Sequence, residues 1–188
     1  MTTHDEKTFT RKDFSKQSLA SETFNDSVFE NCTFHESDFR NSIFSECHFK
    51  NCNLQLIKMD GCRLSNVLFD ECKIVGLEFF KCDNRFFSLE LKSCIVMGCN
   101  FSDLKMKQTN FSESKIKECY FNNTFLAESI FQKADLAGSV FHHANLSKAD
   151  FRNAINYTID PQSNTLKNAH FSTPEALSLL SFFDIRVS

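Results

Sequence analysis

A five-residue periodicity of apolar side chains constrains this chain more than any other feature of its sequence. Stepping by five from Phe9 to Phe79 meets 15 residues, and all of them are large and apolar. Stepping by five from Phe86 to Phe151 meets 14 more, again all apolar. Because only 41% of the residues are hydrophobic, chance does not produce these runs. The register shifts by two residues between the two series.

The position two residues before each periodic residue carries a second signal. Between residues 27 and 151 it is never charged, it is mostly small, and, with the first register continued one step to Cys82, it holds all 9 cysteines. Residues two apart in a short extended segment face the same side. A period of five fits neither an α-helix nor a long strand, so the chain must turn after each pair. Short segments joined by corners predict an all-β solenoid whose coils bury their apolar residues against one another.

The run from Ala134 to Asn153 reads ADLAGSVFHHANLSKADFRN. It resembles the consensus of the pentapeptide-repeat family, A(D/N)LXX, and the resemblance covers about residues 7 to 155. It implies a right-handed quadrilateral β-helix with four repeats per coil. The repeats then make about seven coils, and the rod is about 34 Å long at roughly 4.8 Å per coil.

Two regions depart from the repeat and set the expected domain organisation. We predict a β-helix over residues 1–155, with the register shift near residues 80–88 appearing as an outward bulge. The first coil is expected to be an irregular cap, because Lys7, Lys12 and Glu22 are poor inward residues.

Residues 156–188 are predicted to form a loop and a capping helix. The helix is expected over residues 172–183, where Thr173 suits the N-cap and Pro174 the first helical position. Its apolar side chains exceed what a cap needs, and the resemblance to quinolone-resistance members, which dimerise through this end, implies a homodimer. The candidate interface residues are Leu177, Leu180, Phe182, Phe183 and Ile185.

The sequence offers no motif for catalysis, cofactor binding or metal binding. The cysteines are spaced by multiples of five within each register, unlike zinc ligands, so we interpret them as small buried residues with free thiols. The 6 histidines are placed outside both inward positions. There is no glycine-rich phosphate loop, HExxH or GxSxG motif. We therefore predict no catalytic, cofactor or metal residue, and a protein that is not an enzyme.

The charge distribution bears on the partner. The net charge of −3 does not favour direct nucleic-acid binding. No membrane span or signal peptide is visible, so a soluble cytoplasmic protein is expected. Residues 20–49 hold six acidic residues and one basic residue, a net of −5. These six are the candidate partner-binding residues: Glu22, Asp26, Glu30, Glu36, Asp38 and Glu46.

Two functions are consistent with these features. The resemblance to Qnr-type quinolone-resistance proteins and to immunity proteins against gyrase poisons implies a DNA mimic. Such a protein would bind DNA gyrase or topoisomerase IV and protect it from quinolones or other poisons. The alternative is an interaction scaffold with an unknown protein partner, because a fold does not determine a function.

Overall fold

A corner follows each inward apolar residue, two positions later in the chain. The backbone there is left-handed, with φ of 49° at Asp26, 57° at Asn31 and 55° at Glu36. All 4 glycines of the chain occupy such corners, with φ between 59° and 71°. Non-glycine residues adopt this conformation uncommonly, and asparagine and aspartate most readily among them. The regular spacing of these corners folds the chain into coils.

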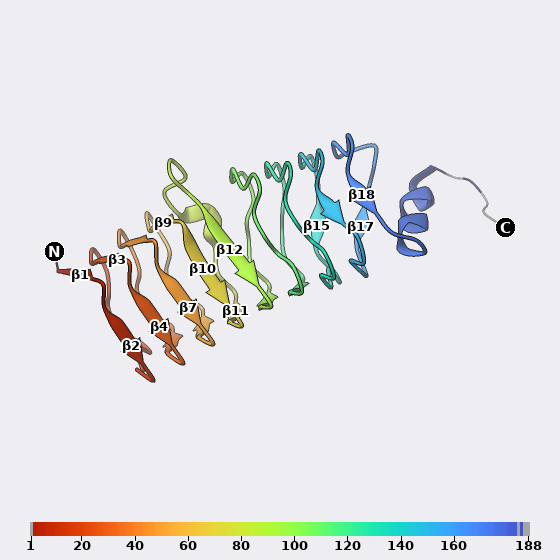
Figure 1. Cartoon of the computed structure of the whole chain (residues 1–188). Coiled ribbons are helices and arrows are strands. Elements are labelled where there is room, and N and C mark those ends of the chain that lie inside the picture. The colour runs from red at the N-terminus through yellow and green to blue at the C-terminus, as the bar shows by residue number, and fades with distance from the viewer. Residues whose placement is uncertain (1, 184, 186–188) are drawn as a thin grey trace.

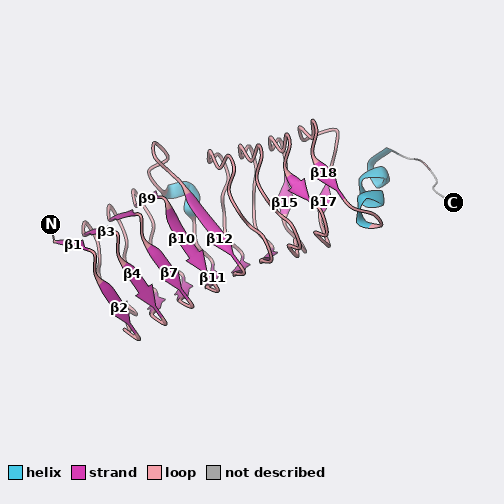
Figure 2. Ribbon diagram, in the orientation of Figure 1, coloured by secondary structure: helices cyan, strands magenta, loops and turns pink. Residues whose placement is uncertain are grey.

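Four corners complete one turn, and successive turns pair in parallel with an offset of 20 residues. Phe9 pairs with Phe29, and Phe29 pairs with Phe49. The result, in a computed structural model that describes residues 2–183 and 185, is a β-solenoid of about eight turns. Figure 1 shows it as a rod that runs from the N-terminus to a short C-terminal helix, and Figure 2 separates strands from loops. The predicted all-β solenoid with a short C-terminal helix is confirmed.

Three sides of the rod carry parallel sheets. The first sheet contains β1 (Thr3–Asp5), β3 (Thr23–Asn25), β6 (Ile43–Ser45) and β9 (Arg63–Ser65). The second contains β12 (Leu89–Lys92), β10 (Val67–Asp70), β7 (His48–Lys50), β4 (Val28–Glu30) and β2 (Thr8–Thr10). The third contains β14 (Lys115–Lys117), β13 (Ile95–Met97), β11 (Lys73–Val75), β8 (Asn53–Gln55) and β5 (Thr33–His35).

Isolated parallel bridges hold the fourth side and most of the later turns. The remaining strand pairs are β15 (Val140–Phe141) with β17 (Thr158–Ile159), and β16 (Asp150–Phe151) with β18 (His170–Phe171). The described residues also include two 3₁₀-helices, η1 (Phe79–Lys81) at the register shift and η2 (Glu175–Phe183) near the C-terminus.

Stacked phenylalanine rings fill the axis. Ring centroids of Phe29 and Phe49 lie 4.6 Å apart, with ring planes 10° from parallel. Those of Phe101 and Phe121 lie 5.0 Å apart at 5°. Each buried ring removes roughly 150–250 Å² from water, so the column supplies the core that a thin rod would otherwise lack.

Where the residue two positions before an inward residue carries a hydroxyl or thiol, that group in most cases donates to the carbonyl of an inward residue in the preceding turn. The Cys52 thiol donates to the Phe29 carbonyl at 3.2 Å, and the Thr124 hydroxyl donates to the Phe101 carbonyl at 3.0 Å. Serine, threonine and cysteine serve equally because each is small and carries a donor. All 9 cysteines are buried and free, as predicted. Burial raises the pKa of the Cys47 thiol to about 11, so that thiol stays protonated.

The N-terminal turn differs from expectation in two ways. Its backbone is regular, since Thr3 pairs with Thr23 at the usual offset. Lys7 and Lys12, expected to disturb this turn, are exposed to water. His4, predicted to lie outside the inward positions, begins the ladder one step before Phe9. Its ring stacks on Phe24 at 4.6 Å, and its Nε2 lies 2.9 Å from Glu22 Oε2.

At the other end, the coil runs past residue 155, where the sequence predicted a loop. Asp150 pairs with His170, and Tyr157 and Ile159 are buried. These additions at both ends explain why the rod has about eight turns rather than the predicted seven. Leu179 of η2 packs against the core at the end of the last turn.

The register shift raises the pairing offset from 20 to 22 residues on three sides of the rod, where β10 pairs with β12, β11 pairs with β13 and Glu78 pairs with Asn100. Leu68 pairs with His48 at an offset of 20 but with Glu90 at an offset of 22. The prediction that Phe86 points inward is wrong: Phe86 is 65% exposed, and Phe87 is only 7% exposed. The two additional residues let the chain leave the surface and return one residue later, so Phe87 reaches the axis instead.

Candidate functional site

Three carboxylates stack at one corner of the first three turns. Asp26 and Glu46, two of the candidate partner-binding residues, are 20 residues apart and are joined by Glu6, and all three are exposed. Each is at a left-handed corner, with φ of 52° at Glu6, 49° at Asp26 and 51° at Glu46. Neighbouring turns lie about 4.8 Å apart. We call Glu6, Asp26 and Glu46 the acidic corner.

The acidic corner ends at the fourth turn. Asn66 occupies the same corner there, and its Nδ2 donates to Glu46 Oε1 at 2.6 Å. Ser88 and Gln108 follow on the next two turns. The negative stripe therefore covers the N-terminal three turns and does not continue along the rod.

The other predicted acidic residues are already paired. Glu22 contacts His4 at the axis, and Glu30 lies 3.6 Å from Lys50. Glu36 lies 3.9 Å from Lys16 and 3.3 Å from His35.

Asp38 accepts hydrogen bonds from the Arg40 guanidinium at 2.6–3.1 Å, which lowers the pKa of the carboxyl. Glu36 is 10 residues, half a turn, beyond Asp26, and so stands at the diagonally opposite corner. The structure therefore does not bring the six candidates into one patch.

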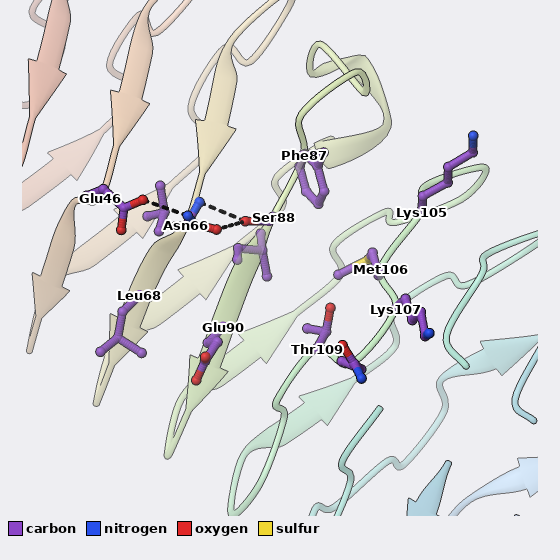
Figure 3. Close-up of a pocket in the computed structure, with 13 residues that line it drawn as sticks. Glu46, Asn66, Leu68, Phe87, Ser88, Glu90, Lys105, Met106, Lys107 and Thr109 are labelled. Carbon is purple, nitrogen blue, oxygen red and sulfur yellow. Dashed lines mark hydrogen bonds between the residues drawn. The ribbon is translucent and has the colours of Figure 1, made fainter. Parts of the chain in front are cut away.

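A groove of about 430 Å³ opens beside the register shift. Figure 3 shows it between the turn that contains Ser88 and the segment that contains Lys105 and Lys107. Its lining residues are Glu46, Asn66, Val67, Leu68, Phe87, Ser88, Leu89, Glu90, Lys105, Met106, Lys107, Gln108 and Thr109. We call it the shift groove. The sequence predicted an outward bulge here but not the groove, and the two-residue slip was its only signal.

One side of the shift groove is a polar network that begins at the acidic corner. The Ser88 hydroxyl donates to Asn66 Oδ1 at 2.6 Å, and Asn66 in turn donates to Glu46, as the dashed lines of Figure 3 show. The other side carries Lys105 and Lys107. The groove thus has carboxylate groups on one wall and ammonium groups on the other.

The loop outside the groove is fixed by charge and exposes an aromatic ring. Asp83 accepts from Arg63 at 3.0 Å and from Arg85 at 2.7 Å, and Arg85 in particular holds the pKa of this carboxyl well below its usual range. The Arg63 guanidinium also lies 5.9 Å from the centre of the exposed Phe86 ring. Phe80, on η1, is exposed as well.

The helix η2 has two rows of apolar side chains, because a 3₁₀-helix repeats every three residues. Leu179 and Phe182 belong to a half-buried row, and Leu179 packs against the core. Leu177, Leu180 and Phe183 form the other row, in which Leu177 is 50% exposed and Phe183 47% exposed.

Beyond η2, Ile185 is also exposed. Of the candidate interface residues, Phe182 therefore belongs to the row that packs on the solenoid. The other four lie in the second row or just beyond it.

Two further observations concern chemistry and membranes. Within residues 2–183 and 185, no group of three or more His, Cys, Asp or Glu side chains is arranged to hold a metal ion. Over the same residues, no helix has the length and apolar character to cross a membrane.

Comparison with known proteins identifies the repeat. A family described as "Pentapeptide repeat region" matches residues 22–94, and "Pentapeptide repeats (8 copies)" matches residues 94–132 and 119–155. No curated protein matches the chain.

Among solved structures, a trypsin-treated variant of QnrB1, described as a plasmid-mediated fluoroquinolone resistance protein, is 16% identical with a TM-score of 0.72. That match covers 100% of this chain and 99% of the other. A second trypsin-treated QnrB1 variant is 17% identical with a TM-score of 0.63, covering 99% of each chain. At these identities the similarity establishes the shared fold.

Proposed function

We propose that this chain, which belongs to the pentapeptide-repeat family, is a protein-binding module without catalytic activity of its own. Its axis is filled by side chains, from the His4–Phe24 stack to the Phe151–Phe171 stack. The groups that can meet a partner therefore lie on the outer surface of the rod.

The acidic corner is the observation that carries this proposal. Like charges stacked on neighbouring strands destabilise a sheet, so the fold gains nothing from this arrangement. The same left-handed corner accepts Asn66 and Gln108 on later turns, which shows that the corner geometry does not demand carboxylates. A cationic surface on a partner would relieve the repulsion and bind this end of the rod.

The partner we propose is DNA gyrase or topoisomerase IV, with protection against quinolones or other gyrase poisons as the outcome. The likeness of the fold to the QnrB1 variants supports this choice. A duplex strand carries one phosphate per roughly 3.4 Å, and the acidic corner places one carboxylate per roughly 4.8 Å. The carboxylates would stand in for phosphates over the three N-terminal turns.

The test is a gyrase supercoiling assay with and without ciprofloxacin. We expect the wild-type protein to restore supercoiling in the presence of the drug. A triple variant, Glu6→Gln, Asp26→Asn and Glu46→Gln, should lose this effect while its melting temperature stays equal or rises, because the repulsion is removed. Glu36→Gln, at the diagonally opposite corner, is the matched control and should behave as wild type. No protection by wild type at micromolar concentration would overturn the gyrase proposal.

We also propose a homodimer through the exposed row of η2, in which Leu177 and Phe183 present the largest apolar surface. Sedimentation analysis of wild type against a Leu177→Asp and Phe183→Asp double variant tests it. The variant should be monomeric with an unchanged solenoid melting temperature, and a monomeric wild type would overturn the proposal.

A scaffold role with a different protein partner is the second candidate. The later turns favour it, because their charges are neutralised in pairs such as Lys117–Asp135 at 3.0 Å and Lys133–Glu113 at 2.9 Å. Such a mixed surface does not resemble a nucleic acid. Pull-down that recovers a protein other than the two topoisomerases, lost in the acidic-corner variant, would favour the scaffold.

A further inference from the structure

One strand edge of the solenoid has unpaired backbone groups next to the shift groove. Among the described residues, the N–H and C=O of Lys105 and the C=O of Lys107 have no backbone partner. The equivalent groups one turn later are all paired. The Phe125 N–H donates to Leu104 at 2.9 Å, the Phe125 C=O accepts from Met106 at 2.8 Å, and the Ala127 C=O accepts from Gln108 at 3.0 Å.

The register shift is the cause of this difference. Residues 84–86 leave the surface of the rod, so the turn before Lys105 has no strand at this point. Ser88 then pairs backwards: its N–H donates to Leu64 at 3.0 Å, and its C=O accepts from Val67 at 3.2 Å. The irregular turn is thus bonded to its predecessor on this side and leaves the edge of its successor free.

The shift groove gives this edge the form of a binding site. Met106, 2% exposed, and Phe87, 7% exposed, form an apolar floor. Lys105 and Lys107 flank Met106 and both are exposed, as Figure 3 shows. Unpaired backbone groups beside an apolar floor are the features that accept an added strand.

We propose that the shift groove binds an extended peptide segment of a protein partner, which adds as a β-strand to the edge formed by residues 105–107. The segment would donate to the Lys105 and Lys107 carbonyls and accept from the Lys105 N–H. The inference rests on the proposed protein-binding function but does not depend on the partner being gyrase.

The charges of the groove specify the side chains of that segment. Lys105 has no ion pair among the described residues, and Lys107 shares an exposed pair with Glu128 at 3.3 Å. Opposite charges on neighbouring strands attract, so carboxylates are favoured beside these two lysines. Glu46 and Glu90 line the other wall, where neutral or basic side chains are favoured. The segment therefore places acidic side chains beside Lys105 and Lys107, and these acidic residues alternate with apolar ones along the strand.

Titration with a synthetic peptide tests the proposal on the full chain. The probe is acetyl-Thr-Glu-Val-Glu-Val-Thr-amide, followed by amide NMR, with a control peptide in which proline replaces the first valine. Saturable shifts should centre on Lys105–Lys107. The control should bind about tenfold more weakly, because it lacks a donor worth roughly one hydrogen bond. Absence of saturable shifts with the first peptide would overturn the proposal.

A matched pair of proline variants tests the edge itself. Lys105→Pro removes an unpaired N–H, so it should leave the melting temperature unchanged and weaken the peptide about tenfold. Phe125→Pro removes a paired N–H and should lower the melting temperature. Native-state hydrogen exchange should be fast at the Lys105 amide and slow at the Phe125 amide. Equal protection of the two amides would contradict the proposal.

A charge-reversed variant keeps the test decisive if the proline variant does not fold. Lys105→Glu with Lys107→Glu should lose the acidic peptide and bind the same peptide with lysine in place of glutamate. If the double variant still preferred the glutamate peptide, the assignment of Lys105 and Lys107 as the groups that select an acidic segment would be overturned. A negative gyrase assay alongside positive peptide binding would remove gyrase as the partner and leave this site in place.

Discussion

The regular turns and the turn that contains the register shift use the same interior but leave different surfaces. On the side of Phe79 the ladder passes the shift without a break, with Phe79 and Phe101 stacked at 4.7 Å. On the adjacent side Phe86 is exposed and the edge at Lys105 is unpaired. In a regular turn the backbone bonds to the neighbouring turns and the inward side chains fill the axis, so its sequence varies at the outward-facing positions. The irregular turn is where backbone groups become available to another molecule.

The largest expected effect comes from placing a charge at a buried phenylalanine of a regular turn. The same substitution at the exposed phenylalanine of the irregular turn should have little effect. Phe34 is fully buried, and its ring stacks on Phe14 at 5.0 Å. Phe34→Asp loses about 3–5 kcal/mol of packing and also buries a charge, which together exceed or approach the stability of an ordinary domain. Circular dichroism should show no cooperative melting transition. Phe86→Asp makes the same chemical change at an exposed ring and should melt as wild type; a cooperative Phe34→Asp protein would contradict the register.

The second prediction tests which phenylalanine of the irregular turn reaches the axis. Phe87→Ala should lower the free energy of unfolding by about 3 kcal/mol, the cost of removing a buried ring. Phe86→Ala should change it by less than about 0.5 kcal/mol, as for an exposed site. Urea denaturation of both variants measures the difference. The reverse order would show that Phe86 is the inward residue, as the spacing alone had predicted.

The interior was predictable from the sequence because it is repeated. Each inward position faces the same neighbours one turn away, so a single rule describes Phe29, Phe49 and Phe121 alike. The rule also explained the cysteines, since a thiol fits the carbonyl site as serine does. Prediction failed where the chain path is not repeated. Phe86 and Phe87 are equally apolar, and only the route of the two additional residues decides between them.

The candidate site was less predictable for the same reason. The 20-residue stacking of Asp26 with Glu46 followed from the period, but the pairing of Glu22 with His4 needed a turn that begins before the apolar series. Sequence counting grouped Glu36 with Asp26, although half a turn separates them. The shift groove arises from an interrupted ladder, and the two-residue slip marks its place in the sequence without showing which backbone groups it leaves unpaired.

The third prediction concerns a deletion that makes the irregular turn regular, so that the difference between the two kinds of turn should disappear. Phe86 already lies five residues before Leu91, and deleting Asn84 and Arg85 also places it five residues after Phe79, so the two registers become one. The ladder should then be continuous past Lys105, and each recovered hydrogen bond contributes about 0.5–1.5 kcal/mol. The melting temperature should stay equal or rise by a few degrees. Amide exchange at Lys105 should slow to the rate at Phe125, and a fast Lys105 amide in the deletion variant would show that the shift is not the cause of the free edge.

The smallest expected effect concerns an ion pair between an aspartate and the arginine two residues later, which occurs in both kinds of turn. Asp150 accepts from Arg152 in a regular turn, as Asp83 does from Arg85 in the loop. The Arg152 guanidinium, with help from Gln132, lowers the pKa of Asp150 from 3.8 to about 2.

The sign of the pH dependence follows from that lowered pKa. The ionised Asp150 is favoured in the folded state, so its contribution is complete above about pH 4 and is lost as the pH falls towards about 2. Thermal melts from pH 5 to pH 2 should show a shallower decline for Asp150→Asn than for wild type. Asp83→Asn should leave this slope almost unchanged and instead speed amide exchange in residues 84–87, because opening of the loop breaks the pairs of Asp83 with Arg63 and Arg85 while the solenoid stays folded. An equal change of slope for the two variants would mean that the loop is part of the cooperative unit and that the irregular turn is as firmly folded as the regular ones.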